Sequence, residues 1–174
     1  MSVGLDVIHI TGRLQHNAAV FSALLEGVAD AQARWKPEPD KWSILEVVNH
    51  LGDEEEQDFR MRLRLLLDEP QRDWPPIDPA RWAIDRQYNK REPAESLERF
   101  LRARMESLEW LHTLRGRDWE RMHEGKVGPP LRAGDLLCSW LGHDLIHIRQ
   151  INRLHREYLT SVCPGFSPDY AGAW

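Results

Sequence analysis

The sequence predicts an all-α protein, a four-helix bundle with a long crossover between its second and third helices. Four segments repeat apolar residues at steps of three and four, the period of an amphipathic helix. No segment shows the alternation that is typical of a strand. One connection, residues 69–92, is long and contains four prolines. Helices that each have one apolar face need a common core, and a bundle provides it.

Length and composition indicate one globular domain over residues 1–174, of which 41% are apolar. The formal charge of −5 disfavours nucleic acid as a partner. No apolar run approaches the roughly 20 residues of a membrane span, so we expect no membrane association. The N-terminus does not resemble a signal peptide. Because Cys138 and Cys163 do not form a disulfide framework, we expect a cytoplasmic protein.

The first helix is expected over about residues 5–30. His9 and His16 lie opposite its apolar stripe, so we expect both to be exposed to solvent. A loop with Pro37 and Pro39 follows, because proline does not continue a helix. The stripe consists of Val7, Ile10, Leu14, Ala18, Phe21, Leu25 and Val28.

The second helix is expected over about residues 43–68, and it begins with a capping box. The Ser43 hydroxyl can accept a hydrogen bond from the backbone N–H of Glu46, and the Glu46 carboxylate can accept one from Ser43. The connection that follows is expected to contain one short helix near residues 80–88. Its length allows the second and third helices to lie parallel.

The third helix is expected over about residues 93–115, with Pro93 in its first turn. The fourth is expected over about residues 134–159, after a loop rich in glycine and proline. The tail, residues 160–174, is expected to be irregular. Its aromatic residues indicate that it docks on the bundle, and they are Phe166, Tyr170 and Trp174.

The fourth helix has two histidines on its inward face. His143 and His147 are four residues apart, so their side chains stack on one face of the helix, one turn apart. Two imidazoles at this spacing can bind one metal ion. They can equally form a buried polar network with Asp144. The spacing leaves both interpretations open.

A firm metal site needs a third ligand, and His50 on the second helix is the best candidate. It lies at the edge of the apolar face of that helix. His112 and His155 flank the core faces of the third and fourth helices, and His123 lies in a loop. Periodicity does not show that His50 is level with the histidines of the fourth helix.

Three charged residues are candidates for other roles. Glu54 follows His50 by one turn and could orient a ligand, act as a general base or be a fourth ligand; the alternative is a partner for an arginine. Asp144 could similarly transfer a proton or orient a ligand. Arg104 lies within the apolar stripe of the third helix, where it could bind an anionic substrate. We favour pairing or an extended side chain that reaches water.

Two segments resemble the DinB/YfiT-like superfamily of bacterial proteins. The first, residues 35–51, contains Trp42-Ser43 at the start of a helix and a histidine seven residues after the serine. The second is His143-Asp144-Leu145-Ile146-His147-Ile148-Arg149-Gln150-Ile151. The resemblance covers nearly the whole chain, including the order of the helices and the long crossover.

The resemblance implies a divalent metal on three histidines, which in this chain are His50, His143 and His147. Family members known as enzymes are transferases and isomerases that use bacillithiol, mycothiol or glutathione, and others are described as metal-dependent hydrolases. We therefore expect a divalent cation, zinc or nickel before others, and a low-molecular-weight thiol as a second candidate cofactor. We also expect a small-molecule substrate and a homodimer. The alternatives are a non-catalytic metal-binding or stress-response module, or a plain histidine network in the core.

Overall fold

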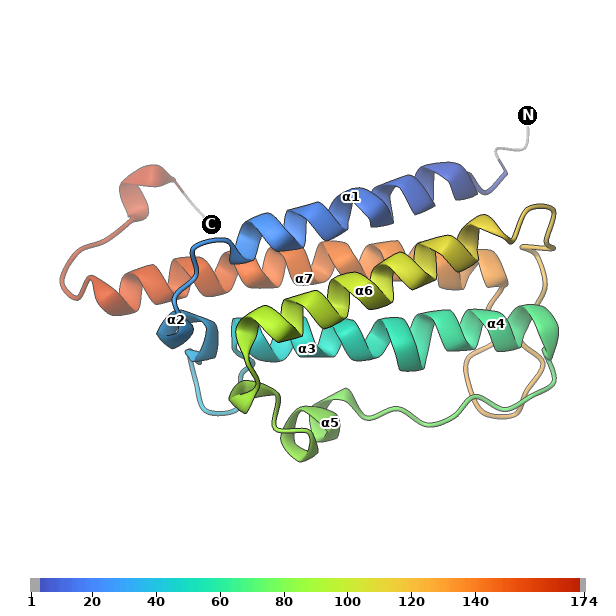
Figure 1. Cartoon of the computed structure of the whole chain (residues 1–174), viewed down its shortest axis with the longest axis horizontal. Helices are drawn as coiled ribbons and strands as arrows, with labels where there is room; N and C mark the ends of the chain where they lie inside the picture. The colour runs from blue at the N-terminus through green and yellow to red at the C-terminus, as the bar shows by residue number, and fades with distance from the viewer. Residues whose placement is uncertain (1–3, 173–174) are drawn as a thin grey trace.

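The chain folds into a four-helix bundle with a long crossover, as predicted (Figure 1). The structure is a computed structural model and describes residues 4–172. Within these residues there is no strand, only one isolated bridge between Met122 and Arg132. The four rods of the bundle are α1 (Val7–Leu25), α3 with α4 (Ile44–Glu54 and Arg60–Asp68, joined by the π-helical turn Glu55–Phe59), α6 (Pro93–His112) and α7 (Ala133–Val162).

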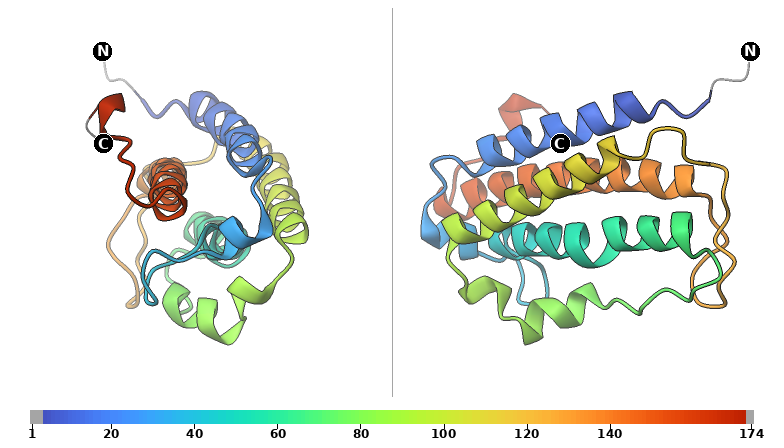
Figure 2. Two further views of the ribbon diagram at one scale, coloured as in Figure 1. Left: turned by 90° about the vertical axis from the view of Figure 1, so that its left-hand side faces the viewer. Right: turned by 45° about the vertical axis from the view of Figure 1, so that its right-hand side comes forward.

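The rod of α3 and α4 runs in the same direction as α6, and α1 and α7 run opposite to both (Figures 1 and 2). The crossover between α4 and α6 passes outside the bundle and contains α5 (Pro79–Asp85) and a short 3-10 helix (Tyr88–Lys90). It is fixed to α3 by the buried Asp53, whose carboxylate accepts hydrogen bonds from Arg86 and Tyr88 of the crossover and from Arg99 of α6. The parallel helices and the short helix in the crossover are therefore confirmed.

Local sequence signals define where several helices begin. Ser43 Oγ accepts from the backbone nitrogen of Glu46 at 3.1 Å, and Glu46 Oε2 accepts from that of Ser43 at 2.8 Å, so the predicted capping box forms at α3. Pro93 is in the first turn of α6, as expected. At α1, the Asp6 carboxylate caps the helix by accepting from the backbone of His9 at 2.8 Å.

Three predicted helix ends differ from the structure, and one of them is that of α6, which ends at His112 rather than near residue 115. The first helix ends at Leu25 rather than near residue 30, because Gly27 adopts a φ of 72°, in the left-handed region that ends helices. A separate short helix, α2 (Asp30–Arg34), follows this turn. At the other end of the chain α7 continues to Val162, beyond the predicted end at residue 159.

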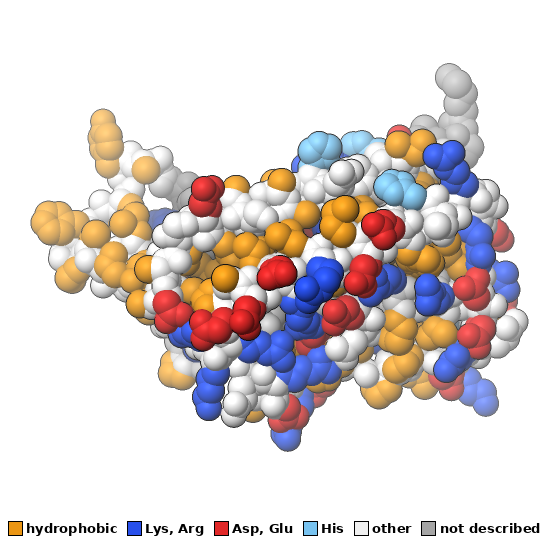
Figure 3. All heavy atoms as spheres, viewed as in Figure 1, with side chains coloured by type: hydrophobic (Ala, Val, Ile, Leu, Met, Phe, Trp, Pro, Cys, Tyr) orange, Lys and Arg blue, Asp and Glu red, His pale blue; other side chains and the backbone are white. Residues whose placement is uncertain are grey.

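In the described part of the C-terminal tail, the aromatic side chains do not pack on the bundle, although Asp169 pairs with Arg156 of α7 at 3.4 Å. Phe166 is 80% exposed and Tyr170 is fully exposed, so the expectation of docking is wrong for both. Figure 1 shows the tail extending past the end of the bundle, and apolar side chains gather at this end in Figure 3. Trp174, the third aromatic residue of that expectation, lies outside the described residues.

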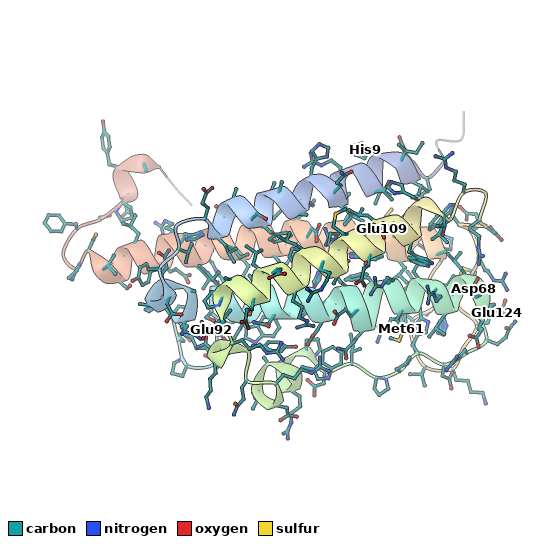
Figure 4. The ribbon with its side chains drawn as sticks, in the orientation of Figure 1. His9, Met61, Asp68, Glu92, Glu109 and Glu124 are labelled. Atoms are coloured by element: carbon teal, nitrogen blue, oxygen red, sulfur yellow. The ribbon has the colours of Figure 1, made fainter. Side chains whose placement is uncertain are left out.

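Two other expectations concern the surface. His9 and His16 are exposed as predicted, and Figure 4 shows His9 pointing away from the bundle. Within residues 4–172, no helix combines the length and the apolar character that crossing a membrane requires.

The core consists of two apolar clusters with a polar layer between them. One cluster contains residues such as Leu14, Leu108 and Trp140, and the other contains residues such as Phe21 and Phe100. The layer receives one buried polar side chain from each rod of the bundle. These side chains are Asn17 of α1, Glu55 of the π-helical turn, Arg104 of α6 and Asp144 of α7.

Candidate metal centre

Three histidines from two rods meet beside the polar layer. Nε2 of His143 lies 3.1 Å from Nε2 of His50 and 3.0 Å from Nε2 of His147. One ring nitrogen from each of the three histidines lies within 4.8 Å of the other two. The structure thus places His50 level with the pair on α7, which periodicity left open.

Aromatic side chains enclose two of the imidazole rings. The Trp42 ring lies 4.8 Å from that of His50, between ring centroids, and the Phe59 ring lies 5.1 Å from that of His143. His50 and His147 are only 5% and 7% exposed, whereas His143 is half-buried. The cluster is therefore largely shielded from water, and His143 is its most accessible member.

Burial keeps the three imidazoles neutral. Loss of hydration, together with the neighbouring histidine rings, lowers the pKa of His50 to about 3 and that of His143 to about 2. Loss of hydration also lowers the pKa of His147. At neutral pH the cluster therefore presents uncharged imidazoles, the form of histidine that binds metal ions.

The outer nitrogens of two rings lie near polar atoms, but of these two only that of His147 has a hydrogen-bond partner. Nδ1 of His147 lies 2.7 Å from Oε1 of Gln150, and Nδ1 of His50 lies 3.4 Å from Oε1 of Glu54. If both Nδ1 atoms carry the hydrogen, the Nε2 lone pairs point toward one another, an arrangement that a cation stabilises. Tetrahedral zinc with Zn–N bonds of about 2.0–2.1 Å separates its nitrogen ligands by about 3.3 Å, close to the Nε2 distances of His143. The donor set therefore fits a divalent metal ion.

Glu54 is buried beside His50 and a second carboxylate. Burial, together with the nearby Asp58, raises the pKa of Glu54 to about 9. Burial also raises the pKa of Asp58, which pairs with Arg62 at 2.6 Å. Glu54 thus lies beside His50 and holds a proton at neutral pH, whereas a general base must be free of it. Its roles in orienting a ligand, as a base or as a fourth ligand stay predictions. Sequence reasoning missed Asp58 as its neighbour, although the spacing of four residues was a signal.

Arg104 and Asp144 meet in the polar layer. The Arg104 guanidinium donates to Asp144 Oδ1 at 2.7 Å and Oδ2 at 2.8 Å, and its Nε donates to Glu55 Oε1 at 2.9 Å. Asn17 donates to the same aspartate at 3.0 Å, and Trp140 donates to Glu55 at 2.7 Å. With Arg104 only 1% exposed, this arrangement supports the pairing interpretation over binding of an anionic substrate.

Other histidines lie apart from the cluster. His112 is exposed at the end of α6. His123 is buried in a loop against the Trp74 ring, with 4.3 Å between ring centroids. His155 contacts the Leu24 carbonyl at 2.8 Å and Gln32 at 2.9 Å, and so joins α7 to α1 and α2.

Fold and site together define a helical bundle with a candidate three-histidine metal centre between its second and fourth rods. A sequence model of the DinB superfamily matches residues 13–151, most of the chain. The chain belongs to the DinB superfamily.

Among solved structures, the chain is similar to YfiT from Bacillus subtilis, described as "a probable metal-dependent hydrolase with an unusual four-helix bundle topology". The TM-score is 0.77 at 21% sequence identity, and the match covers 87% of each chain. At this identity the likeness shows the shared fold alone. A comparison with curated proteins found no match.

Proposed function

We propose that this protein is a metal-dependent enzyme that binds one divalent cation, zinc or nickel, on Nε2 of His50, His143 and His147. The observation that supports this is the convergence of three neutral, largely buried imidazoles from two rods. YfiT, which shares the fold, is described as "a probable metal-dependent hydrolase". The substrate is a small electrophile that water or a low-molecular-weight thiol attacks.

A bound divalent cation supplies Lewis acidity, which lowers the pKa of a water or thiol ligand. Three protein ligands leave a coordination position open, as in catalytic zinc sites. Trp42 and Phe59 limit the access of bulk water to the histidines, and the half-buried His143 marks the side from which a substrate approaches. Within the chain, the imidazoles hold the cation and the aromatic rings shape its surroundings.

Of the two candidates for proton transfer, Glu54 is favoured over Asp144. Glu54 lies beside His50 and holds a proton at neutral pH, because burial and Asp58 raise its pKa to about 9. Asp144 is 0% exposed and receives hydrogen bonds from Arg104 and Asn17. We propose that Asp144 and Arg104 support the site through the packing of the helices. A cytoplasmic homodimer without nucleic-acid or membrane partners completes the proposal.

The metal content of untagged protein is the first test, measured by mass spectrometry. About one ion per chain is expected, lost in His143→Ala and retained in His112→Ala, which removes an exposed histidine. Turnover in a screen of thiol transfer and hydrolysis should vanish in His147→Ala while circular dichroism shows an intact fold. A wild-type chain that binds neither zinc nor nickel after incubation would return the histidines to a core network.

A non-catalytic metal-binding or stress-response module is the second candidate. The low exposure of His50 and His147 fits an ion that joins α3 to α7 without reacting. In this case removal of the ion lowers the unfolding temperature sharply, and no substrate is turned over. Turnover that depends on His147 would exclude it.

A further inference from the structure

We propose that Gln150 is a positioning residue of the candidate metal centre. Its side-chain carbonyl holds the imidazole of His147 so that Nε2 faces the other two histidines. This inference rests on the proposed function and adds a residue beyond the three ligands. It also gives a role to the glutamine that follows the two histidines in the sequence motif of α7.

The contact between Gln150 and His147 has the geometry of a hydrogen bond. Oε1 of Gln150 lies 2.7 Å from Nδ1 of His147. The two residues are three apart on α7, so their side chains lie on the same side of one helical turn. The helix fixes both backbones at a spacing from which the amide reaches the ring.

This hydrogen bond selects one tautomer of His147. A carbonyl oxygen only accepts, so Nδ1 must carry the ring hydrogen. A neutral imidazole has one ring hydrogen, which leaves a lone pair on Nε2. That Nε2 lies 3.0 Å from Nε2 of His143, at the centre of the cluster. Gln150 thus points the metal-binding atom inward before any ion arrives.

Glu54 provides a comparison at the second ligand with an outer partner. Its Oε1 lies 3.4 Å from Nδ1 of His50, which is longer than a good hydrogen bond. The Gln150 contact is shorter, and it satisfies Nδ1 of His147, whereas Nδ1 of His50 and Oε1 of Glu54 have no hydrogen-bond partner. For these reasons we expect Gln150 to determine the orientation of its ligand more strongly than Glu54 does.

The test uses two substitutions with opposite chemistry. Gln150→Leu has a similar size and removes the acceptor, whereas Gln150→Glu keeps an acceptor at the same position. Zinc affinity of the metal-free protein is measured by competition with a coloured chelator. We expect about 10- to 100-fold weaker binding in Gln150→Leu, the usual effect of removing an outer partner of a metal ligand. Gln150→Glu should regain most of the affinity.

A matched control is Gln15→Leu, which makes the same change at an exposed position of α1 and should bind zinc like the wild type. If Gln150→Leu does not fold, Gln150→Asn takes its place, because it keeps the amide but is one methylene too short to reach Nδ1. Equal zinc affinity in the wild type and the folded Gln150 variant would overturn the inference and leave the proposed metal site intact.

Nitrogen-15 NMR of the imidazoles supplies a readout that needs no metal and no activity. In the metal-free wild type, His147 should carry its hydrogen on Nδ1, and Gln150→Leu should shift the population toward the Nε2–H form. A loss of packing alone would not change the tautomer. If the wild type binds no zinc, the proposed function fails, and the NMR result still decides the role of Gln150. An unchanged tautomer in Gln150→Leu would exclude it.

Discussion

Replacing Arg104 by methionine tests whether the polar layer is structural. Burial by itself lowers the pKa of this guanidinium, but Glu55 and Asp144 raise it overall, so the side chain is charged. Methionine fills a similar volume and removes the charge together with its hydrogen bonds. Glu55 and Asp144 then remain in the core, where their side chains are 2% and 0% exposed, without their cationic partner.

The expected loss of stability is large. Removing one partner of a buried ion pair costs about 3–5 kcal/mol, because the remaining charge is uncompensated. Arg104 pairs with two carboxylates at 2.7 Å each, so we expect a value of about 5 kcal/mol. For a chain of this length, each kcal/mol corresponds to roughly 2–4 °C, so the unfolding temperature should fall by about 10–20 °C.

Urea unfolding and thermal unfolding monitored by circular dichroism measure this change. Arg102→Met is the matched control, because its partner Glu98 is exposed and 3.7 Å away, and it should leave the midpoint unchanged. An Arg104→Met variant with wild-type stability would refute the structural role. If that stable variant also lost turnover, Arg104 would instead be a substrate-binding residue.

Three further predictions follow from single contacts. Zinc should raise the unfolding temperature of the wild type but not of His147→Ala, because a ligand that binds only the folded chain stabilises it; a thermal shift assay that shows equal shifts would exclude His147 as a ligand. Glu54→Gln should gain stability relative to the metal-free wild type as the pH rises from 4.5 toward about 9. Over this range the folded wild type keeps a proton that the unfolded chain releases, which lowers the stability of the wild type by up to about 1.4 kcal/mol per pH unit. Urea unfolding of both proteins at about pH 5 and about pH 8 measures this change, and a stability difference that is the same at both pH values would contradict the prediction. Ser43→Ala should lose about 1 kcal/mol with the capping box, and Ser43→Asp should lose less; equal urea midpoints in all three chains would show that the cap contributes nothing.

Features of the fold that depend on neighbouring residues could be predicted from the sequence. The capping box of Ser43, the start of α6 at Pro93 and the short helix in the crossover result from local backbone chemistry. The end of α1 was also encoded locally, at Gly27, but the apolar stripe that continues to Val28 masked it. Where a local signal and a periodic one disagreed, the local signal determined the boundary.

Features that depend on packing between helices could not be predicted in this way. The height of His50 relative to His143 depends on how two rods slide along each other, and no periodicity within one helix contains that information. Arg104 is similar, because its partners lie 49 and 40 residues away on two other helices. For the tail, the sequence predicted a contact that the structure lacks. Aromatic content alone does not provide a surface on which Phe166 can pack.

The π-helical turn begins where one rod passes from the candidate metal centre to the polar layer. In a regular α-helix, consecutive side chains point about 100° apart. Glu54 and Glu55 are consecutive, and both are at most 4% exposed. Glu54 contacts His50, whereas Glu55 pairs with Arg104. The turn that begins at Glu55 is wider, and π-helical turns of this kind are frequent at functional sites.

The polar layer in turn sets the register of the candidate metal centre. On one rod, Glu55 lies in the turn after the one that contains His50. On the other rod, Asp144 is next to His143. Arg104 forms a salt bridge with both carboxylates. Because both salt bridges must form at once, α7 is fixed in height against α3 at the level where the histidines meet. A slide of one helical turn, about 5.4 Å, would separate the imidazoles and leave two buried carboxylates unpaired. The cost of burying this ionic layer therefore has a use, which is to hold three ligands from two rods at one point.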